Sequence, residues 1–490
     1  MLTPVEFYRD IDVVRRILEY CGVSDTDGLR IGEGALKENE ALSSMAEAMT
    51  AEYVAGEGDQ LLRTRGKRQS SRYPSQLGEL LDAGLNISRS VWDRQSITFF
   101  FDVEYCSDKY KGETYANPQQ VFRKLEPVYR CIWDSFREFG ITPMTIATGQ
   151  GYHFVFKVDS YKDDEVTLPA KELVRLGFLE DTVKGKYEHL PWHTKRRRIV
   201  EPELGKAYDS VGKLLEFVVH RVLQRVGEYG ARIPVSIGDI TAGNEKKEMI
   251  NLDLSSYADP LFTRCMRTAF SIHDKNKKNP EMWIRDLPVA VSLPRYTPCN
   301  GNELSLEEIF SNRRHFRNSA NYASAITCTI PECSEGVMQL IRSYEASGLH
   351  KFHKDFDNRP QDDPRDWHRT YDAINTRELP PCVVRALSKP NPALLQPTQI
   401  QTLVRVLTGR EWWHPIHVAG LIRSKYERDH GWDFNWGKYD ANRHAKVWVR
   451  MYAGLLAMGI DQRTDQNCIS HQEKGLCPNE GCGYDLGSYR

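Results

Sequence analysis

The chain has 490 residues, and its 66 lysines and arginines are balanced by 67 aspartates and glutamates, for a formal net charge of −1. This balance excludes a uniformly basic coat for nucleic acid, although a local basic groove remains compatible with it. Hydrophobic residues make up 40% of the chain, which is ordinary for a soluble globular protein of roughly three domains. No apolar run approaches the ~20 residues of a transmembrane helix, and the N-terminus lacks the apolar core of a signal peptide. We therefore expect a cytoplasmic protein without membrane contact.

The predicted elements begin with a helical segment over residues 1–90, where apolar side chains recur at helical spacing between Asp10 and Tyr20. From Ser96 the pattern changes. Residues 97–105 are aromatic and β-branched and are apolar on both faces up to Asp102, which predicts a buried central strand. Further predicted elements are a helix over 121–139, two short strands joined by a glycine turn over 145–157, a helix over 211–226 and a strand over 248–254. This mixture predicts an α+β domain over residues 91–300.

The rest of the chain divides into a connection and a last domain. Residues 352–367 are polar and contain two prolines, which indicates a linker within a region of linker and connecting helices over 301–375. Helical periodicity recurs over 398–407, 416–428 and 441–458. We therefore expect a mainly α domain over residues 376–490.

Asp102 and Glu104 form the first constellation with chemical meaning. Residues i and i+2 of a strand point to the same face, so both carboxylates project together from the end of the predicted central strand. Side-by-side carboxylates repel each other unless a cation neutralises them, and Mg²⁺ or Mn²⁺ are the natural partners of such oxygen ligands. The alternative is a strand end that simply runs into solvent.

The second constellation is the segment 148–153, Thr-Gly-Gln-Gly-Tyr-His. Glycines let a backbone approach a ligand closely and adopt positive φ, and His153 lies on the strand that leaves the turn. This arrangement is compatible with phosphate binding, although by itself it is more typical of an ordinary hairpin with an exposed histidine.

The third constellation runs from Asp253 to Lys275. Asp253 ends an otherwise apolar strand and is expected to face the same cavity as Asp102 and Glu104. Side chains that suit triphosphate oxygens follow it: Arg264, Arg267, Ser271, His273 and Lys275. The alternative is a charged loop after a strand.

In this order, the three constellations resemble the archaeo-eukaryotic primase superfamily over roughly residues 90–300. That family has an apolar strand ending in Asp-x-Asp or Asp-x-Glu, a Ser/Thr-Gly-x-Gly-aromatic-His hairpin, and a strand with Asp followed by Arg and a Ser-x-His-x-Lys-like segment. The resemblance implies a primase-type, RRM-like catalytic domain in which Asp102, Glu104 and Asp253 hold two Mg²⁺ or Mn²⁺ ions. It also implies nucleotide binding by residues of the second and third motifs: Thr148, Gly149, Gly151, His153, Arg267, Ser271, His273 and Lys275.

Two features depart from the family's replicative small subunits. Glu104 stands at the second acidic position, as in the primase-polymerase branches, and no Cys/His zinc knuckle lies between the second and third motifs.

Four C-terminal cysteines form a separate group. Eleven cysteines are too sparse for a disulfide scaffold, but one distant thiol and a closing cluster could bind a [4Fe–4S] cluster or Zn²⁺, with His471 as a substitute ligand: Cys382, Cys468, Cys477 and Cys482. The arrangement resembles the iron–sulfur domain of the primase large subunit over about residues 376–490, which favours [4Fe–4S]. That resemblance implies binding of the template end and the initiating nucleotide.

Basic and aromatic residues suggest further nucleic-acid contacts. The strongest basic run, residues 195–198, is expected to line a template groove, with the cap of a solvated loop as the alternative. The run over 63–72 is more typical of a solvated loop. In the last domain, residues that could stack on bases or meet phosphates, or else belong to the core and the solvated surface, are Arg405, Arg410, Trp412, Trp413, His414, His417 and Arg423.

These observations predict a single-chain DNA primase that makes short primers de novo on single-stranded DNA from NTPs or dNTPs, with DNA polymerase activity as a further expectation. A replicative helicase would act in trans, because the sequence has no Walker-type loop. In a prokaryotic, plasmid or viral setting, the protein would be associated with the nucleoid. The alternatives are a primer-dependent repair or translesion polymerase, a non-catalytic nucleic-acid-binding redox sensor and, more weakly, a metal-dependent nuclease.

Overall fold

The structure is a computed structural model that describes residues 2–57, 70–181, 183, 201–238, 247–273, 290–296, 303–388, 394, 396–409, 413–427, 441–460, 467–479 and 481–489. Several predicted site residues lie outside these ranges: Lys275, the basic runs at 63–68 and 195–198, Arg410 and Trp412. Within the described ranges, no helix combines the length and apolar character that crossing a membrane requires.

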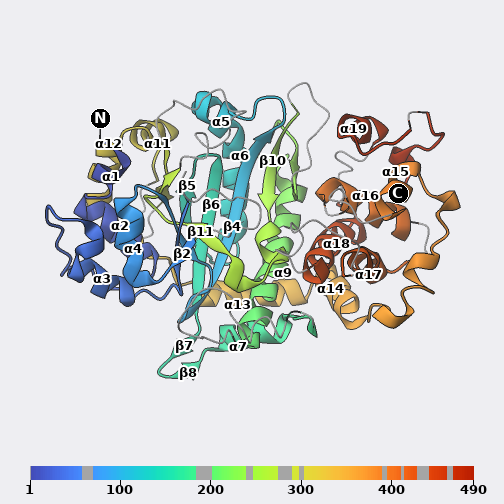
Figure 1. The fold of residues 1–490 in the computed structure, drawn as a ribbon, viewed down its shortest axis with the longest axis horizontal. Coiled ribbons are helices and arrows are strands. Elements are labelled where there is room, and N and C mark those ends of the chain that lie inside the picture. The colour runs from blue at the N-terminus through green and yellow to red at the C-terminus, as the bar shows by residue number, and fades with distance from the viewer. Residues whose placement is uncertain are drawn as a thin grey trace.

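A six-stranded mixed sheet forms the centre of the molecule (Figure 1). Its strands, in spatial order, are β14 (Leu293–Tyr296), β5 (Met144–Ala147), β6 (Gly151–Asp159), β4 (Ser96–Ser107), β10 (Glu248–Asp253) and β9 (Val235–Ser236). β9 runs parallel to β10, and the other neighbouring strands pair antiparallel. β4 is the predicted central strand, and the expectation of an α+β fold is confirmed.

The two faces of this sheet have different chemistry. Helices α6 (Pro118–Arg137) and α9 (Pro202–Arg225) pack against each other, and α6 also covers the face that carries the aromatic side chains of β6. There Phe154 lies 5.5 Å from Tyr129, and Phe156 lies 5.3 Å from Phe136, between ring centroids. Side chains alternate along a strand, so Asp102 projects to the opposite face.

The N-terminal segment is only partly helical, which corrects the prediction for residues 1–90. Its helices are α1 (Pro4–Phe7), α2 (Ile11–Tyr20), α3 (Glu40–Glu47) and α4 (Leu77–Asp82). Its strands β1 (Val54–Glu57), β2 (Ser70–Arg72) and β3 (Asn86–Ser90) join β11 (Cys265–Arg267) in a second sheet of order β11–β3–β1–β2. Periodicity missed these strands because they are short and poor in apolar residues. Their partner β11 also lies far along the chain, so the pairing crosses the boundary predicted at residue 90.

The remaining elements are mostly helical. In chain order, α5 (Glu113–Ala116) follows β4. The hairpin of β7 (Tyr161–Lys162) and β8 (Glu165–Val166) and then α7 (Leu168–Leu176) follow β6 and precede α9. After β11 come β12 (Ile272–His273), β13 (Ala290–Val291), α11 (Leu306–Arg313) and α12 (Phe316–Ser324). The later helices are α13 (Ser334–Glu345), α14 (Gly348–Asn358), α15 (Pro381–Ser388), α16 (Pro397–Thr408), α17 (Pro415–Tyr426), α18 (Ala441–Ala457) and α19 (Cys468–Glu473).

The predicted linker at 352–367 begins inside a helix, which is a second correction. Residues 352–358 form the end of α14, whose side chains His353 and Phe356 are buried. The helix begins at Gly348, before the polar stretch. A linker predicted from polar residues and prolines therefore included the second half of this amphipathic helix. The three later helical predictions correspond to α16, α17 and α18.

Buried charges join the C-terminal helices to α9, beside which they lie in Figure 1. Lys213 of α9 contacts Asp209 at 2.9 Å and Asp357 of α14 at 2.6 Å. Arg450 of α18 contacts Asp209 at 3.0 Å and Glu216 at 3.5 Å. We call this set the junction network: Asp209, Lys213, Glu216, His353, Asp357 and Arg450. It fixes α14 and α18 against the helix layer of the central sheet.

Candidate active site

Strand register brings the three predicted carboxylates together on one face of the central sheet. Asp102 of β4 is the direct antiparallel partner of Asp253 of β10. Glu104, two residues further along β4, is opposite Asn251. Directly opposed residues have Cβ atoms about 4.5–5.5 Å apart and point to the same side. Segments about 150 residues apart in sequence therefore present Asp102, Glu104 and Asp253 to one space.

The donor set at this face fits a hard divalent cation. Within the described ranges, no three His, Cys, Asp or Glu side chains converge closely enough to coordinate one metal ion as they stand. The side chain of Asp102 is 17% exposed, although its Oδ1 atom is buried. Carboxylate oxygens are the ligands that Mg²⁺ and Mn²⁺ prefer. The residue types and their register are compatible with such an ion.

His153 flanks Asp102 on the side away from Asp253. The two are register partners across β4 and β6, with His153 Nε2 3.5 Å from Asp102 Oδ1. Burial lowers the pKa of His153 to about 3, and the positive charge of Arg267 adds to the effect. The imidazole is therefore neutral at physiological pH.

Arg267 reaches the same space from the second sheet. Met266 points toward α2, where its sulfur meets the Tyr20 hydroxyl, so alternation along β11 directs Arg267 to the opposite face. The Nη1 atom of Arg267 and the Nδ1 atom of His153 are buried and have no hydrogen-bond partner within the described ranges. Buried polar atoms are normally paired. Two orphaned nitrogens beside Asp102 therefore suit a polar ligand.

The glycine turn is tight because other groups press against it. Thr148 Oγ1 accepts hydrogen bonds from the backbone N–H groups of Gln150 and Gly151 at 3.3 and 3.1 Å. A Cβ on Gly151 would lie 1.8 Å from the Val103 carbonyl oxygen, and one on Gly149 would lie 2.3 Å from the His273 ring. Neither glycine has positive φ. Close approach, and not a left-handed backbone, is what requires them.

The remaining residues of the third constellation are divided between structure and site. Arg264 forms an ion pair with Asp259 and donates to the Ser255 carbonyl at 3.0 Å. Ser271 is fully buried, and its hydroxyl accepts from the Ile87 N–H at 2.8 Å and donates to the Ile272 carbonyl at 3.0 Å. Arg264 and Ser271 therefore have a structural role, because their side chains hydrogen-bond to backbone groups of neighbouring segments. His273, by contrast, lies against the glycine turn.

Two residues near this turn were missed by the sequence reasoning. Arg313, at the end of α11, donates from Nη2 to the Gly149 carbonyl at 3.0 Å, and burial lowers its pKa to about 10. Tyr115 of α5 pairs its hydroxyl with His273 Nδ1 at 3.1 Å. Neither lies in a motif of recognisable spacing. A buried arginine at the end of a short amphipathic helix has no sequence signal, so only the tertiary contacts place it here.

The C-terminal cysteines gather at one end of the helical domain. The pKa of Cys382 in α15 is raised to about 11, by burial first and then by the neighbouring thiols of Cys477 and Cys468. Cys468 Sγ donates to the Tyr484 carbonyl at 3.6 Å, which brings the segment that carries Cys482 back toward it. Within the described ranges no three of these thiols stand close enough to share a metal ion as they are placed. The assignment therefore depends on residue type, because thiolates are the ligands of [4Fe–4S] clusters and of structural Zn²⁺.

Other predicted ligands and contacts in this domain are already engaged within the chain. His471 pairs its Nε2 with the Thr402 hydroxyl at 2.9 Å and is buried, so it points into the helical core. The proposed nucleic-acid contacts are likewise packed: Arg405 is buried, Trp413 and His417 lie against Tyr371, His414 pairs with Asp355, and Arg423 pairs with Glu427. The structure supports the alternative reading of these residues, in which the aromatic side chains belong to the core and the charged ones form intramolecular ion pairs.

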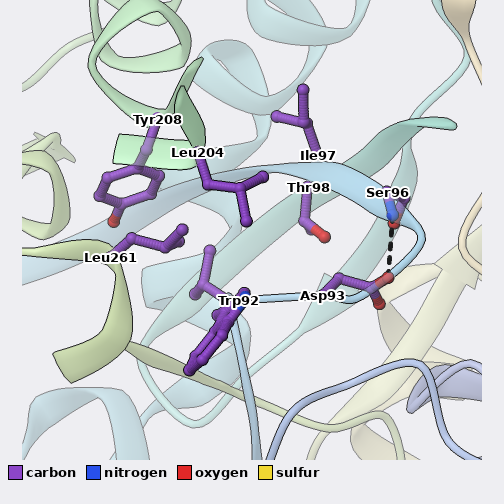
Figure 2. A pocket seen from close by; sticks show the side chains of 9 residues that line it. Trp92, Asp93, Ser96, Ile97, Thr98, Leu204, Tyr208 and Leu261 are labelled. Atoms are coloured by element: carbon purple, nitrogen blue, oxygen red, sulfur yellow. Dashed lines mark hydrogen bonds between the residues drawn. The ribbon is translucent and has the colours of Figure 1, made fainter. Parts of the chain in front are cut away.

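A small apolar pocket lies at the opposite end of β4 (Figure 2). Its walls come from the β3–β4 connection, β4, the start of α9 and Leu261, and include Trp92, Thr98 and Tyr208. Thr98 is four residues from Asp102, or ~13 Å along a strand at ~3.3 Å per residue. The pocket therefore lies on the same face of the sheet as Asp102 but is separate from the carboxylates.

The chain shows no match to any protein-family model, to any curated protein or to any solved structure. What the fold and site define is an α+β protein with a carboxylate-bearing mixed sheet and a C-terminal group of cysteines.

Proposed function

We propose that this protein is a single-chain DNA primase that synthesises short primers on single-stranded DNA by metal-dependent nucleotidyl transfer. The observation that supports the proposal most directly is the strand register, in which Asp102 stands between Asp253 and His153 with Glu104 two residues further along β4. The order of the three sequence constellations, and their resemblance to the primase superfamily, supply the substrate class.

In this proposal Asp102, Glu104 and Asp253 hold Mg²⁺ or Mn²⁺. When bound, the metal supplies activation of the attacking 3′-hydroxyl and charge stabilisation for the leaving pyrophosphate. The side chains of the chain itself position the nucleotide. Arg267 offers a guanidinium to phosphate oxygens, and neutral His153 offers one N–H. His273 and the turn at 148–151 border the same end of the sheet.

The C-terminal domain would hold a [4Fe–4S] cluster, or Zn²⁺, through Cys382, Cys468, Cys477 and Cys482. Elemental analysis of anaerobically purified protein tests this assignment. We expect iron or zinc in the native protein and its loss in Cys382→Ala. Cys328→Ala, which removes a buried thiol outside the group, is the matched control and should keep the metal. Equal metal content in all three proteins would contradict the assignment.

The test of the function is synthesis without a primer. Purified protein is incubated with single-stranded DNA, Mg²⁺ or Mn²⁺ and labelled NTPs or dNTPs, beside Asp102→Asn and Asp253→Asn. Asp159→Asn is the control, because Asp159 lies on β6 but is exposed and pairs with Lys157. Short products from native protein and the control only would support a primase. Extension only of added primers would favour a repair polymerase, and no synthesis in either case would contradict the enzymatic proposal.

A further inference from the structure

A short turn after β10 controls the direction of Asp253. This turn is the 3₁₀ helix η4 (Ser255–Ala258), which begins two residues after the carboxylate. The backbone N–H of Ser255 donates to Asp253 Oδ1 at 2.7 Å. The orientation of the Asp253 carboxylate is thus tied to the position of the first residue of η4.

Three successive carbonyl groups of η4 each accept a hydrogen bond from a side chain of a different part of the chain. Arg264 Nη2 donates to Ser255 at 3.0 Å, the Tyr208 hydroxyl to Ser256 at 2.9 Å, and Arg443 Nη2 to Tyr257 at 3.0 Å. We call these three donors the η4 clamp. Arg264 follows the turn and Tyr208 belongs to α9, whereas Arg443 lies in the first turn of α18.

Arg443 is placed firmly enough to transmit the position of its helix. Its side chain is fully buried, 3.6 Å from a Glu180 carboxylate oxygen and 3.9 Å from Asp209 Oδ1. α18 packs against η4 and is fixed to α9 by Arg450 in the junction network. The guanidinium fork has a fixed planar geometry, which lets it hold a carbonyl in a defined place.

The same turn also reaches the strand of the other two carboxylates. The Tyr257 hydroxyl donates to the Phe100 carbonyl at 2.8 Å and accepts from the Phe100 N–H at 3.3 Å. Phe100 lies two residues before Asp102 on β4 and on the same face. A movement of Tyr257 would therefore displace the backbone of both carboxylate-bearing strands, β4 and β10.

We propose that Arg443 is a positioning residue through which the C-terminal helices fix the orientation of Asp253, so that the C-terminal domain is a structural part of the carboxylate site. The consequence for the reaction rests on the proposed function, in which Asp253 binds the metal. The domain then acts in two ways, because it carries the cysteine group and also completes the geometry of the sheet face.

The experiment compares Arg443→Met and Arg443→Lys with Arg450→Met. Arg450 is a suitable control because it is buried on the same helix and also contacts Asp209, but its ion-pair partners Asp209 and Glu216 belong to α9 and not to η4. Hydrogen exchange is measured on peptides covering residues 253–258, and primer synthesis is measured over a range of Mn²⁺ and nucleotide concentrations, each at a temperature where all variants remain folded.

For Arg443→Met we expect faster exchange over 253–258 and a higher Mn²⁺ concentration for half-maximal synthesis. We also expect kcat to fall by up to about 100-fold, the cost of a misplacement of ~1 Å, with little change in nucleotide KM. Arg443→Lys should restore part of the loss, and it remains informative if Arg443→Met does not fold. Arg450→Met loosens α18 on α9 but keeps the Arg443–Tyr257 hydrogen bond, so it should raise the 253–258 exchange and the Mn²⁺ requirement clearly less than Arg443→Met does.

Two outcomes separate this inference from the proposed function. Unchanged exchange over 253–258 in both Arg443 variants, or equal effects of Arg443→Met and Arg450→Met, would overturn the positioning role even if synthesis depends on Asp253. Selective exchange in the Arg443 variants of a protein that makes no product would support the positioning of Asp253 and overturn the primase proposal.

Discussion

The junction network and the carboxylate face both bring acidic side chains together from distant segments, but they neutralise them differently. In the junction, Lys213 and Arg450 hold Asp209 at 2.9 and 3.0 Å, and these charges keep the pKa of Asp209 low despite full burial. At the carboxylate face, Asp102 stands beside a second carboxylate and an imidazole that burial keeps neutral. In the first cluster the carboxylate contacts two cations directly, whereas the arginines nearest the second lie beside His153 (Arg267) and pair with Asp259 (Arg264). The difference separates a structural cluster from a candidate catalytic one.

The largest expected effect lies in the junction. Asp209→Leu leaves Lys213 and Arg450 buried with one carboxylate fewer, so we expect a loss of about 3–5 kcal/mol in the free energy of unfolding. Urea denaturation measures it. Asp159→Asn, which breaks the exposed pair with Lys157, should cost less than about 1 kcal/mol. Similar losses in both variants would show that the junction charges are screened and that the comparison is wrong.

At the carboxylate face, removal of an acidic group should reduce activity and not stability, the reverse of the effect expected in the junction. Asp253→Asn keeps an oxygen that can accept from the Ser255 N–H but removes one of the opposed negative charges, so the metal-free protein should be as stable as the native protein or more stable. Synthesis should fall by at least about 100-fold, or about 2.7 kcal/mol in the barrier, because a metal ligand is lost. Unfolding curves in EDTA and primer assays measure the two effects. A strong loss of stability would place Asp253 among the structural charges.

A smaller effect is expected at the glycine turn. In Gly151→Ala the new methyl group would overlap the Val103 carbonyl, which lies between the two carboxylates of β4, so we expect a loss of about 1–3 kcal/mol in stability together with reduced synthesis. Gly227→Ala meets no atom within 4 Å and is the matched control. If Gly151→Ala kept native stability and activity, the close approach would not be required.

The pH dependence of stability should be the most gradual effect. Burial lowers the pKa of His153 to about 3 and of His220 and His471 to about 4, below the ordinary value of about 6.5. Between pH 6.5 and 4 the unfolded chain therefore binds more protons than the folded chain, and stability falls as pH falls. Each histidine contributes at most about 1.4 kcal/mol per pH unit. Urea unfolding at pH 7.5 and 5 measures the slope, which His220→Leu should reduce. An unchanged slope would mean that His220 is not held neutral.

Local sequence patterns predicted the elements with long, regular periodicity. The apolar run 97–105 became the centre of β4, and the amphipathic stretches became α6, α9, α16, α17 and α18. The same patterns missed β1 to β3, whose stabilising partner β11 lies far along the chain, and they divided α14 at its polar half. Local periodicity describes one face of one element, and it contains no information about a partner strand of low hydrophobicity.

For the site, the sequence by itself determined which carboxylates share a strand face, because residues i and i+2 of any strand do so. Only the tertiary structure decided that Asp253 is paired with Asp102, that His153 is neutral, and that Arg443 of α18 holds the turn behind Asp253. Register, burial and clamping arise from contacts between segments more than 100 residues apart. Motif spacing therefore predicts the chemical groups of this site, whereas packing sets their charge states and directions.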